Sequence, residues 1–495
     1  MHLTLINPPF TFNHKATVNY SQCLGILYIA ANVSAHDHHV MVIDALMEGK
    51  DNRQPLSDTL VQIGLNHADT AARIIADTDV IGVSVPFSHL GNIAFELIKE
   101  IKKQFPNTPI VMGGVFPSTQ PQLAMDSKAD FLILGEGEQS MVQLMEHLRA
   151  GSTGKLSEGI ISTHQPLEPQ RAISRFVSDL DQLPFPARDL IPFDKYVGYS
   201  QRERTKRRSA SLITSRGCPF KCEFCSVHPV CGFEYRPHSA KRVLAEIDHL
   251  VDQYQVSRFE IEDDNFTLHR QRAEEILEGI IERNAKGANL SWVAHNGLRI
   301  DTLKENLVKL MQASNCESVN LALEHGDEEM LDIIGKKLRL KRVIEVAKLT
   351  RKYGLKSGIF VLYGYPGETR ERFERGLAFC RRIREADPDM AFSFFLAQPY
   401  PGTKLYSRAV EEGLLPGDIF SSVEKIERFD TSSKCWFYTD DFDETELRRR
   451  FRVLNLTLRP GAYFREIIAG LLPASLRKPA RFLYHLTRKA LTILR

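Results

Sequence analysis

Short apolar runs alternate with amphipathic stretches over the first 150 residues of the chain. Apolar runs of strand length, with helical patterns between them, occur at 3–9, 40–46, 81–87, 109–115 and 131–138. Short apolar strands separated by helical patterns indicate a parallel sheet with crossover helices. The pattern predicts a doubly wound, Rossmann-like α/β domain over residues 1–150, without the G-x-G-x-x-G fingerprint of dinucleotide binding.

A second series of strand-like runs begins near residue 209. Six such runs, separated by helical patterns, occur at 209–220, 258–266, 290–299, 318–326, 357–369 and 391–403. The series predicts a partial (β/α)6 barrel of TIM type over residues 206–410, with reactive groups at the carboxyl ends of the strands. Between the two domains, residues 151–205 are polar and contain several prolines, so we expect a linker or a small irregular insertion there.

The last region, residues 411–495, is expected to be a helical tail that is basic and amphipathic towards its end. Arg477, Arg481 and Arg488 share one helical face, with Leu483 and Leu486 opposite. Such a helix either packs its apolar side on its own protein or lies on an anionic membrane. The second alternative predicts peripheral membrane contact through the tail.

Composition narrows the class of protein. The 495 residues include 64 Lys and Arg against 62 Asp and Glu, so no overall field favours nucleic acid as a partner. The start MHLTLINPPF reads as a buried strand that stops at two prolines, and no apolar run approaches the ~20 residues of a bilayer span. We therefore expect a cytoplasmic protein, associated with a membrane only if its tail binds one.

Three of the eight cysteines crowd into one loop. In SRGCPFKCEFC, Cys218, Cys222 and Cys225 have the spacing Cys-x3-Cys-x2-Cys after a predicted strand. Three thiolates hold three irons of a 4Fe-4S cluster, which leaves the fourth iron open to the amino-acid end of S-adenosylmethionine. The alternative is a structural zinc site, completed by His228 or Cys231.

The other cysteines carry less information. Cys231 reads most simply as a buried or incidental thiol, and Cys316 and Cys380 fall in stretches that we expect to be helical and part of the core.

The cysteine motif, with Phe224 before its third cysteine, resembles that of the radical S-adenosylmethionine superfamily. Segments further along the predicted barrel resemble that family in the same order. The resemblance assigns the methionyl amino group to Glu262, Asp263 and Asp264, the ribose and carboxylate to Asn296, Arg299 and Glu324, and the adenine to a turn with Gly364 and Pro366. The competing interpretations are a helix N-cap cluster for the three acids and a structural ion pair between Arg299 and Glu324.

The first domain resembles the cobalamin-binding domain that precedes many radical enzymes. The resemblance rests on Pro8 and Pro9, the stretch LGILYIAANV at 24–33, Asp44, Ser84, Gly113 and Gly114, and GEGE at 135–138, which begins with Gly135. The alternative is that these glycines are only the turns of a doubly wound sheet. The loop after the first strand, TFNHKATVNYSQ, lacks the Asp-x-His-x-x-Gly pattern, so we expect base-off cobalamin without an axial histidine, or a domain that has lost the cofactor.

Together these resemblances imply a cobalamin-dependent radical enzyme that methylates an unactivated carbon. In that scheme, cobalt takes a methyl group from one S-adenosylmethionine while the cluster cleaves another. The alternatives are radical oxidation or ring closure, as in the anaerobic magnesium-protoporphyrin ester cyclase, and a zinc-stabilised binding protein. A methylthiotransferase is excluded, because Cys23 is the only cysteine in residues 1–150. The implied partners are a small-molecule substrate, which is hydrophobic if the tail binds a membrane, and an electron donor such as flavodoxin or ferredoxin.

Overall fold

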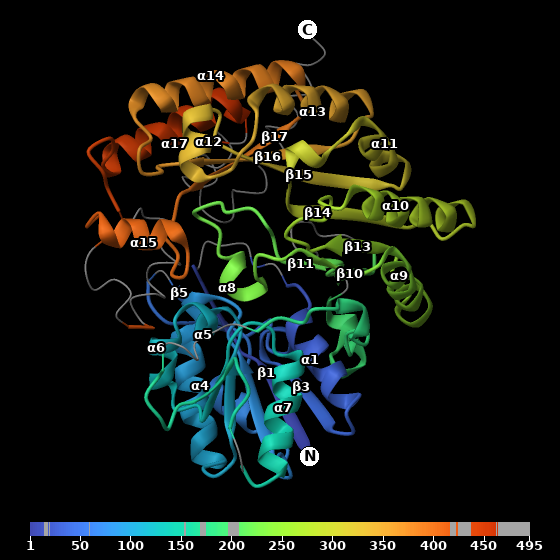
Figure 1. The fold of residues 1–495 in the computed structure, drawn as a ribbon, viewed down its shortest axis with the longest axis vertical. Helices are drawn as coiled ribbons and strands as arrows, with labels where there is room; N and C mark the ends of the chain where they lie inside the picture. Colours follow the sequence, from blue (N-terminus) through green and yellow to red (C-terminus); the bar gives the residue numbers. More distant parts are fainter. Residues whose placement is uncertain are drawn as a thin grey trace.

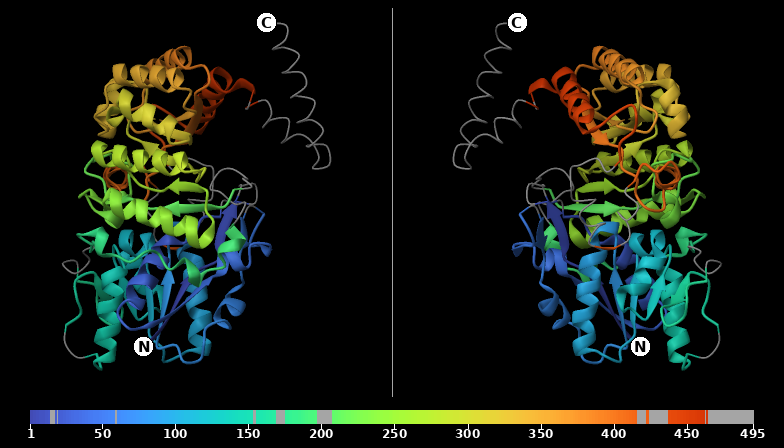
Figure 2. Two further views of the ribbon diagram at one scale, coloured as in Figure 1. Left: turned by 90° about the vertical axis from the view of Figure 1, so that its right-hand side faces the viewer. Right: turned by 90° about the vertical axis from the view of Figure 1, so that its left-hand side faces the viewer.

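The chain forms two sheets of mainly parallel strands, and one sheet lies above the other: the first is in the blue to cyan part and the second in the green to orange part (Figures 1 and 2). The computed structural model describes residues 1–13, 18, 20–58, 60–152, 155–168, 175–196, 207–415, 422–423, 437–461 and 463. The basic end of the predicted tail, from residue 464, lies outside the described residues.

The first sheet has the strand order β3-β1-β6-β7-β8-β9. Its strands are β1 (His2–Asn7), β3 (His39–Asp44), β6 (Val80–Ser84), β7 (Ile110–Gly113), β8 (Phe131–Ile133) and β9 (Ile160–Ser162). The first five are parallel, and β9 pairs antiparallel to β8. The chain leaves β1 first towards β3 and then towards β6, so the order reverses between β1 and β6. Ligands of open parallel sheets bind at such a reversal, beyond the carboxyl ends of the strands.

Both faces of the first sheet are buried, as the continuous apolar strands predict. Leu5 packs into one core and Ile6 into the other, because successive side chains of a strand point to opposite faces. The helices α1 (Leu24–Ser34) and α7 (Glu138–Arg149) cover the face of Leu5, and α3 (His67–Ala71) and α4 (Gly91–Gln104) cover the other. The short helices of this domain are α2 (Ala45–Glu48), α5 (Val115–Thr119) and α6 (Pro121–Ala124).

A small antiparallel sheet, which the sequence did not predict, flanks this domain. It has the order β2-β5-β4, with β2 (Phe10–Asn13), β4 (Arg53–Pro55) and β5 (Leu60–Ile63).

The second sheet contains the six predicted barrel strands in chain order, all parallel. They are β10 (Ser209–Leu212), β13 (Arg258–Ile261), β14 (Ser291–Leu298), β15 (Cys316–Glu324), β16 (Ser357–Tyr363) and β17 (Ala391–Leu396). The helices between them are α9 (Ala240–Tyr254), α10 (Arg270–Ala285), α11 (Glu305–Ala313), α12 (Glu328–Ile334), α13 (Leu340–Lys352) and α14 (Arg370–Ala386). This arrangement is the predicted partial barrel.

Further elements lie outside this series of six strands and their connecting helices. They are β11 (Ser215–Arg216), α8 (Val227–Cys231), β12 (Arg236–Pro237), α15 (Lys404–Glu411) and α17 (Glu444–Leu458). The helix α17 packs beside α14, β16 and β17 (Figure 1). Cys380 is buried in α14, as expected, whereas the helical prediction for Cys316 is wrong, because α11 ends at Ala313 and Cys316 begins β15.

Part of the segment predicted to be a linker is built into the fold. β9 extends the first sheet, and it is followed, among the described residues, by 3-10 turns at Leu180–Gln182, Arg188–Leu190 and Phe193–Tyr196. Arg188 is fully buried; it donates hydrogen bonds to Glu246 of α9 (2.8 Å) and to the Ser211 carbonyl (2.7 Å). The segment thus joins the two domains through buried polar contacts. None of the described helices is long and apolar enough to span a bilayer.

Candidate functional site

The three motif cysteines line one cavity of about 320 Å³, here called the thiol cavity. Their loop follows β11 and needs Gly217, which has φ +79°, because a Cβ there would lie 2.1 Å from the Glu234 carbonyl oxygen. Burial raises the pKa of the Cys225 thiol to about 12. Metal binding, which needs thiolates, would therefore release protons.

The other walls of the thiol cavity come from the carboxyl ends of successive barrel strands. Four of the residues that the resemblance assigns to S-adenosylmethionine are among its lining residues, together with Phe224 of the cysteine loop: Asp264, Asn296, Arg299 and Glu324. The fold thus brings together residues that are up to 100 positions apart in the sequence.

Arg299 and Glu324 do not form the structural ion pair that the sequence left as an alternative. Glu324, at φ +71°, accepts a hydrogen bond from the Lys336 ammonium at 2.9 Å. Arg299 pairs with Asp301 at 2.8 Å, and its guanidinium lies 3.5 Å from the centre of the Phe220 ring. Arg299 and Glu324 therefore line the same cavity with different partners.

Four predicted residues lie outside the lining of the thiol cavity. Asp263 is buried and accepts hydrogen bonds from the Thr214 amide (2.5 Å) and the Ser215 hydroxyl (2.6 Å), so it joins the β13 loop to the segment before the cysteines. Gly364 and Pro366 are buried in the turn after β16. Glu262 lines the neighbouring cavity instead.

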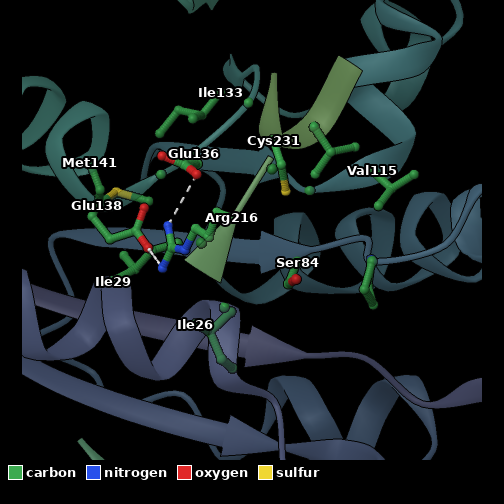
Figure 3. Close-up of a pocket in the computed structure, with 18 of the residues that line it drawn as sticks. Ile26, Ile29, Ser84, Val115, Ile133, Glu136, Glu138, Met141, Arg216 and Cys231 are labelled. Atoms are coloured by element: carbon green, nitrogen blue, oxygen red, sulfur yellow. Dashed lines mark hydrogen bonds and ion pairs between the residues drawn. The ribbon is translucent and has the colours of Figure 1, made fainter. Parts of the chain in front are cut away.

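The second cavity lies at the carboxyl ends of the first sheet, where the strand order reverses between β1 and β6, and has a volume of about 310 Å³. We call it the interdomain cavity, because barrel residues close it (Figure 3). Of the residues predicted for cobalamin, it is lined by Ser84, Gly113, Gly114 and Gly135, whereas Pro8 is buried outside its lining.

Small residues keep this cavity open. Gly114 has φ +108°, and a Cβ there would lie 2.7 Å from the Val85 carbonyl oxygen, so a larger residue would be strained. A Cβ on Gly25 would meet nothing within 4 Å, and one on Gly113 would meet its first neighbour at 3.9 Å. Side chains at these two positions would occupy the cavity itself.

The two cavities share a wall. Asp264 lines both of them, and Glu262 and Cys231 line the interdomain cavity from the barrel side. Burial, together with the negative charge of Asp263, raises the pKa of Asp264 to about 6. Asn296 donates a hydrogen bond to Glu262 (3.2 Å), which further connects the two linings.

A buried ion network closes the interdomain cavity on one side (Figure 3). Arg216 of the barrel pairs with Glu138 at 2.8 Å and Glu136 at 3.3 Å, and Arg236 pairs with Glu136 at 2.8 Å. Burial alone would lower the pKa of Arg216, but the two glutamates raise it above its ordinary value. Because Arg216 lies two residues before Cys218, the network links the first domain directly to the cysteine loop.

Several lining residues had no individual role in the predictions made from the sequence. Asn265 lines the thiol cavity, and its buried side-chain oxygen accepts no hydrogen bond among the described residues. Lys336, Gly25 and Arg216 also line the cavities. Asn265 belongs to the acidic segment already singled out by its resemblance, whereas Lys336 follows a helix and carries no signal of its own.

The residues present fit the implied cofactors. Three half-buried thiols in one cavity suit a 4Fe-4S cluster with one open iron. The unpartnered Asn265 oxygen offers an acceptor to the ammonium or a hydroxyl of S-adenosylmethionine. The slot left by Gly25 and Gly113 has room for part of a large cofactor such as cobalamin.

Comparison with known proteins identifies both domains. A family model described as the radical SAM superfamily matches residues 212–380, and one described as the B12 binding domain matches residues 17–145. The first model covers the cysteine loop and implies a 4Fe-4S cluster and S-adenosylmethionine as cofactors of the second domain. The second assigns cobalamin to the first domain.

Similar proteins share the whole arrangement. An uncharacterised methyltransferase of Pyrococcus horikoshii is 30% identical over 94% of this chain and 95% of its own. The cytidylyl-2-hydroxyethylphosphonate methyltransferase of Streptomyces wedmorensis is 29% identical over 83% of this chain and 82% of its own. The fold also resembles the radical S-adenosylmethionine methyltransferase TsrM from Kitasatospora setae, solved with cobalamin and a 4Fe-4S cluster bound, with a TM-score of 0.66 and 17% identity over 92% of this chain and 90% of that one. The chain belongs to the cobalamin-dependent radical S-adenosylmethionine methyltransferase family.

Proposed function

We propose that this enzyme transfers a methyl group from S-adenosylmethionine to an unactivated carbon of a small molecule that binds where the two cavities meet. The observation that carries the proposal is that Asp264 lines both the thiol cavity and the interdomain cavity. A substrate at this wall would lie within reach of both cofactors. Bound in these cavities, the cluster would supply the electron that cleaves S-adenosylmethionine, and cobalamin would carry the methyl group.

The protein's own groups have binding and orienting roles in this proposal. Cys218, Cys222 and Cys225 hold the cluster. Asn265 and the Glu324–Lys336 pair orient the amino-acid end and the ribose of S-adenosylmethionine, because they present acceptors and a cation in one cavity.

On the other side of the shared wall, the cobalamin site is formed by both domains. Ser84, Gly113 and Gly135 line it from the first sheet, and Arg216 closes it from the barrel. We expect base-off cobalamin, because the loop after β1 lacks the Asp-x-His-x-x-Gly pattern. Paramagnetic resonance of the cob(II)alamin form should show no coupling to a histidine nitrogen.

The proposal also includes two external partners. Reduction of the cluster requires an electron donor, for which flavodoxin and ferredoxin are the candidates. A hydrophobic substrate is favoured if the basic end of the chain brings the enzyme to a membrane.

The test is an anaerobic reaction with S-adenosylmethionine whose methyl group carries deuterium. The reconstituted enzyme, with cobalamin and a chemical reductant, is incubated with a small-molecule extract of the source cells. We expect a product with three deuterium atoms, formed together with S-adenosylhomocysteine and 5'-deoxyadenosine. Formation of 5'-deoxyadenosine with an oxidised or cyclised product that lacks the label would support the alternative, radical oxidation or ring closure, and would reject methyl transfer.

A further inference from the structure

Glu223, which lies between Cys222 and Phe224 in the cysteine loop, contacts several other parts of the barrel. Its backbone amide donates to the Ile334 carbonyl at 2.9 Å, and its carbonyl accepts from the Leu405 amide at 2.8 Å. Its carboxylate accepts from the Tyr365 hydroxyl at 3.1 Å and from the Lys404 ammonium at 2.7 Å. Three separate parts of the barrel therefore converge on this single residue of the loop.

Tyr365, one of the residues that contact Glu223, lies in a turn that is closed by the buried carboxylate of Glu368. Tyr365 is fully buried in the turn after β16, and Glu368 ends the same turn. The Glu368 carboxylate accepts a hydrogen bond from the Gly364 amide at 2.6 Å, which closes the turn and fixes the position of Tyr365. The turn thus depends on Glu368 remaining a well-placed acceptor.

Two further groups hold Glu368. The Asp327 amide donates to His325 Nδ1 at 3.1 Å, so His325 Nε2 carries the proton and donates it to Glu368 Oε1 at 3.0 Å. On the other carboxylate oxygen, the Arg450 guanidinium of α17 donates at 2.7 Å. Both oxygens of Glu368 are then surrounded by donors, an arrangement that an amide side chain cannot match because its NH2 group would turn towards one of them.

Arg450 itself is fully buried and is fixed on several sides. It also donates to the Glu368 carbonyl at 3.0 Å, to the Asp441 carbonyl at 3.1 Å and to Glu446 at 3.1 Å. The helix α17 that carries it lies beyond residues 212–380, the part matched by the radical superfamily model. Arg450 is a buried cation with Glu368 and Glu446 as its acidic partners, and removing it would leave the buried Glu368 carboxylate without the arginine that pairs with it.

We infer that Arg450 is a positioning residue for the cluster, acting on the cysteine loop through the buried relay Arg450, Glu368, Tyr365 and Glu223. The relay makes α17 part of the machinery that presents Cys222 and Cys225 to the iron. The inference rests on the assignment of the three cysteines to the cluster, and it is independent of whether the reaction ends in methylation.

The first test is hydrogen exchange on the protein without iron, because this readout needs no activity. Tyr365→Phe removes only the hydroxyl and keeps the buried ring. Amide exchange over residues 221–226 should then become about tenfold faster, the effect of losing one hydrogen bond to a charged group. Exchange over residues 131–141 of the first domain should stay unchanged.

A second set of variants tests the far end of the relay. Arg450→Met should speed exchange over 221–226 as Tyr365→Phe does, and Arg450→Lys should restore part of the protection. Arg449→Met is the matched control, because Arg449 neighbours Arg450 on α17 and pairs with Glu446 but not with Glu368. In the reconstituted enzyme, Tyr365→Phe should raise the KM for S-adenosylmethionine several-fold at unchanged cobalamin affinity.

Two results would overturn the inference. One is wild-type exchange over 221–226, either in folded Arg450→Met or, together with a wild-type KM, in Tyr365→Phe. The other is faster exchange spread evenly over the whole barrel in both Tyr365→Phe and Arg450→Lys, which would reduce the relay to a contribution to global stability. If Arg450→Met does not fold, Tyr365→Phe and Arg450→Lys still decide between these outcomes.

Discussion

Single residues decide whether the two cavities can receive their ligands. At the interdomain cavity the decisive feature is the absence of side chains at Gly25 and Gly113. Gly113 was predicted individually through its place at a strand end, whereas Gly25 was included only as part of the apolar stretch 24–33 that resembles the cobalamin-binding domain. Lys336 was not predicted for another reason: it carries no sequence motif, and only folding brings it within hydrogen-bond distance of Glu324.

Gly25→Leu should weaken cobalamin binding by about tenfold or more. A Cβ at this position has open space, so the rest of the leucine side chain would occupy the cavity, and a loss of about 1.4 kcal/mol already corresponds to a factor of ten. Anaerobic titration followed by absorbance measures the affinity. Gly25→Ala is the control, with nearly unchanged affinity and a slightly more stable α1. Equal affinity in Gly25→Leu would show that cobalamin does not use this part of the cavity.

At the scale of elements, the strands of both sheets were predicted where apolar runs are long and bounded by turns. All six barrel strands follow the sequence pattern, and they lie in the sheet in chain order, as expected when consecutive strands of a series are neighbours. The three-residue strand β9 and the small sheet of β2, β4 and β5 escaped prediction, since short edge strands carry little periodicity. Cys316 was misplaced because the polar start of β15 continues the pattern of the preceding helix.

The packing of elements also determines how stability responds to pH. His238 follows β12 and is buried between the two domains, where it stacks on Tyr28 of α1 at 6.4 Å and pairs with Asp181 at 3.2 Å. Burial lowers the pKa of His238 to about 4. The unfolded chain therefore takes up a proton near pH 6.5, before the folded protein does, and stability falls as the pH drops from there towards about 4.

Because of this single histidine, we expect the free energy of unfolding to fall by about 2 kcal/mol as the pH is lowered from about 7.5 to about 5. His238→Gln should lack that part of the pH dependence while keeping a polar group beside Asp181. Urea unfolding of both proteins at the two pH values measures the difference. Parallel loss of stability in the wild type and in His238→Gln would mean that His238 is already protonated in the folded state.

At the scale of the whole molecule, the two domains are joined by buried charges around their shared cavity, and the chain continues beyond them into a basic end. From the barrel, Arg216 pairs with Glu138 and Arg236 pairs with Glu136 of the first domain. From the segment between the domains, Arg188 pairs with Glu246 of the barrel and donates to the Ser211 carbonyl. The basic end from residue 464 lies outside the described residues. Packing on its own protein and binding to an anionic membrane therefore both stay predictions for this end.

Removal of residues from about 473 onward should weaken sedimentation with anionic vesicles while leaving cleavage of S-adenosylmethionine intact. Each basic residue near an anionic surface contributes about 1 kcal/mol, and salt screens this attraction. Binding of the full chain should therefore fall with added salt and be absent with neutral vesicles. Equal, salt-insensitive sedimentation of the full and shortened chains would assign the tail to packing on its own protein.

The most direct measurement of the central claim is the amount of 5'-deoxyadenosine formed by anaerobically reconstituted protein with S-adenosylmethionine and a reductant. The wild type should bind about four irons and form 5'-deoxyadenosine. Cys225→Ala should form none, whereas Cys231→Ala, which changes a thiol of the neighbouring cavity, should form it as the wild type does. Formation of 5'-deoxyadenosine by Cys225→Ala at the wild-type rate would contradict the assignment of the three cysteines to a radical-generating cluster.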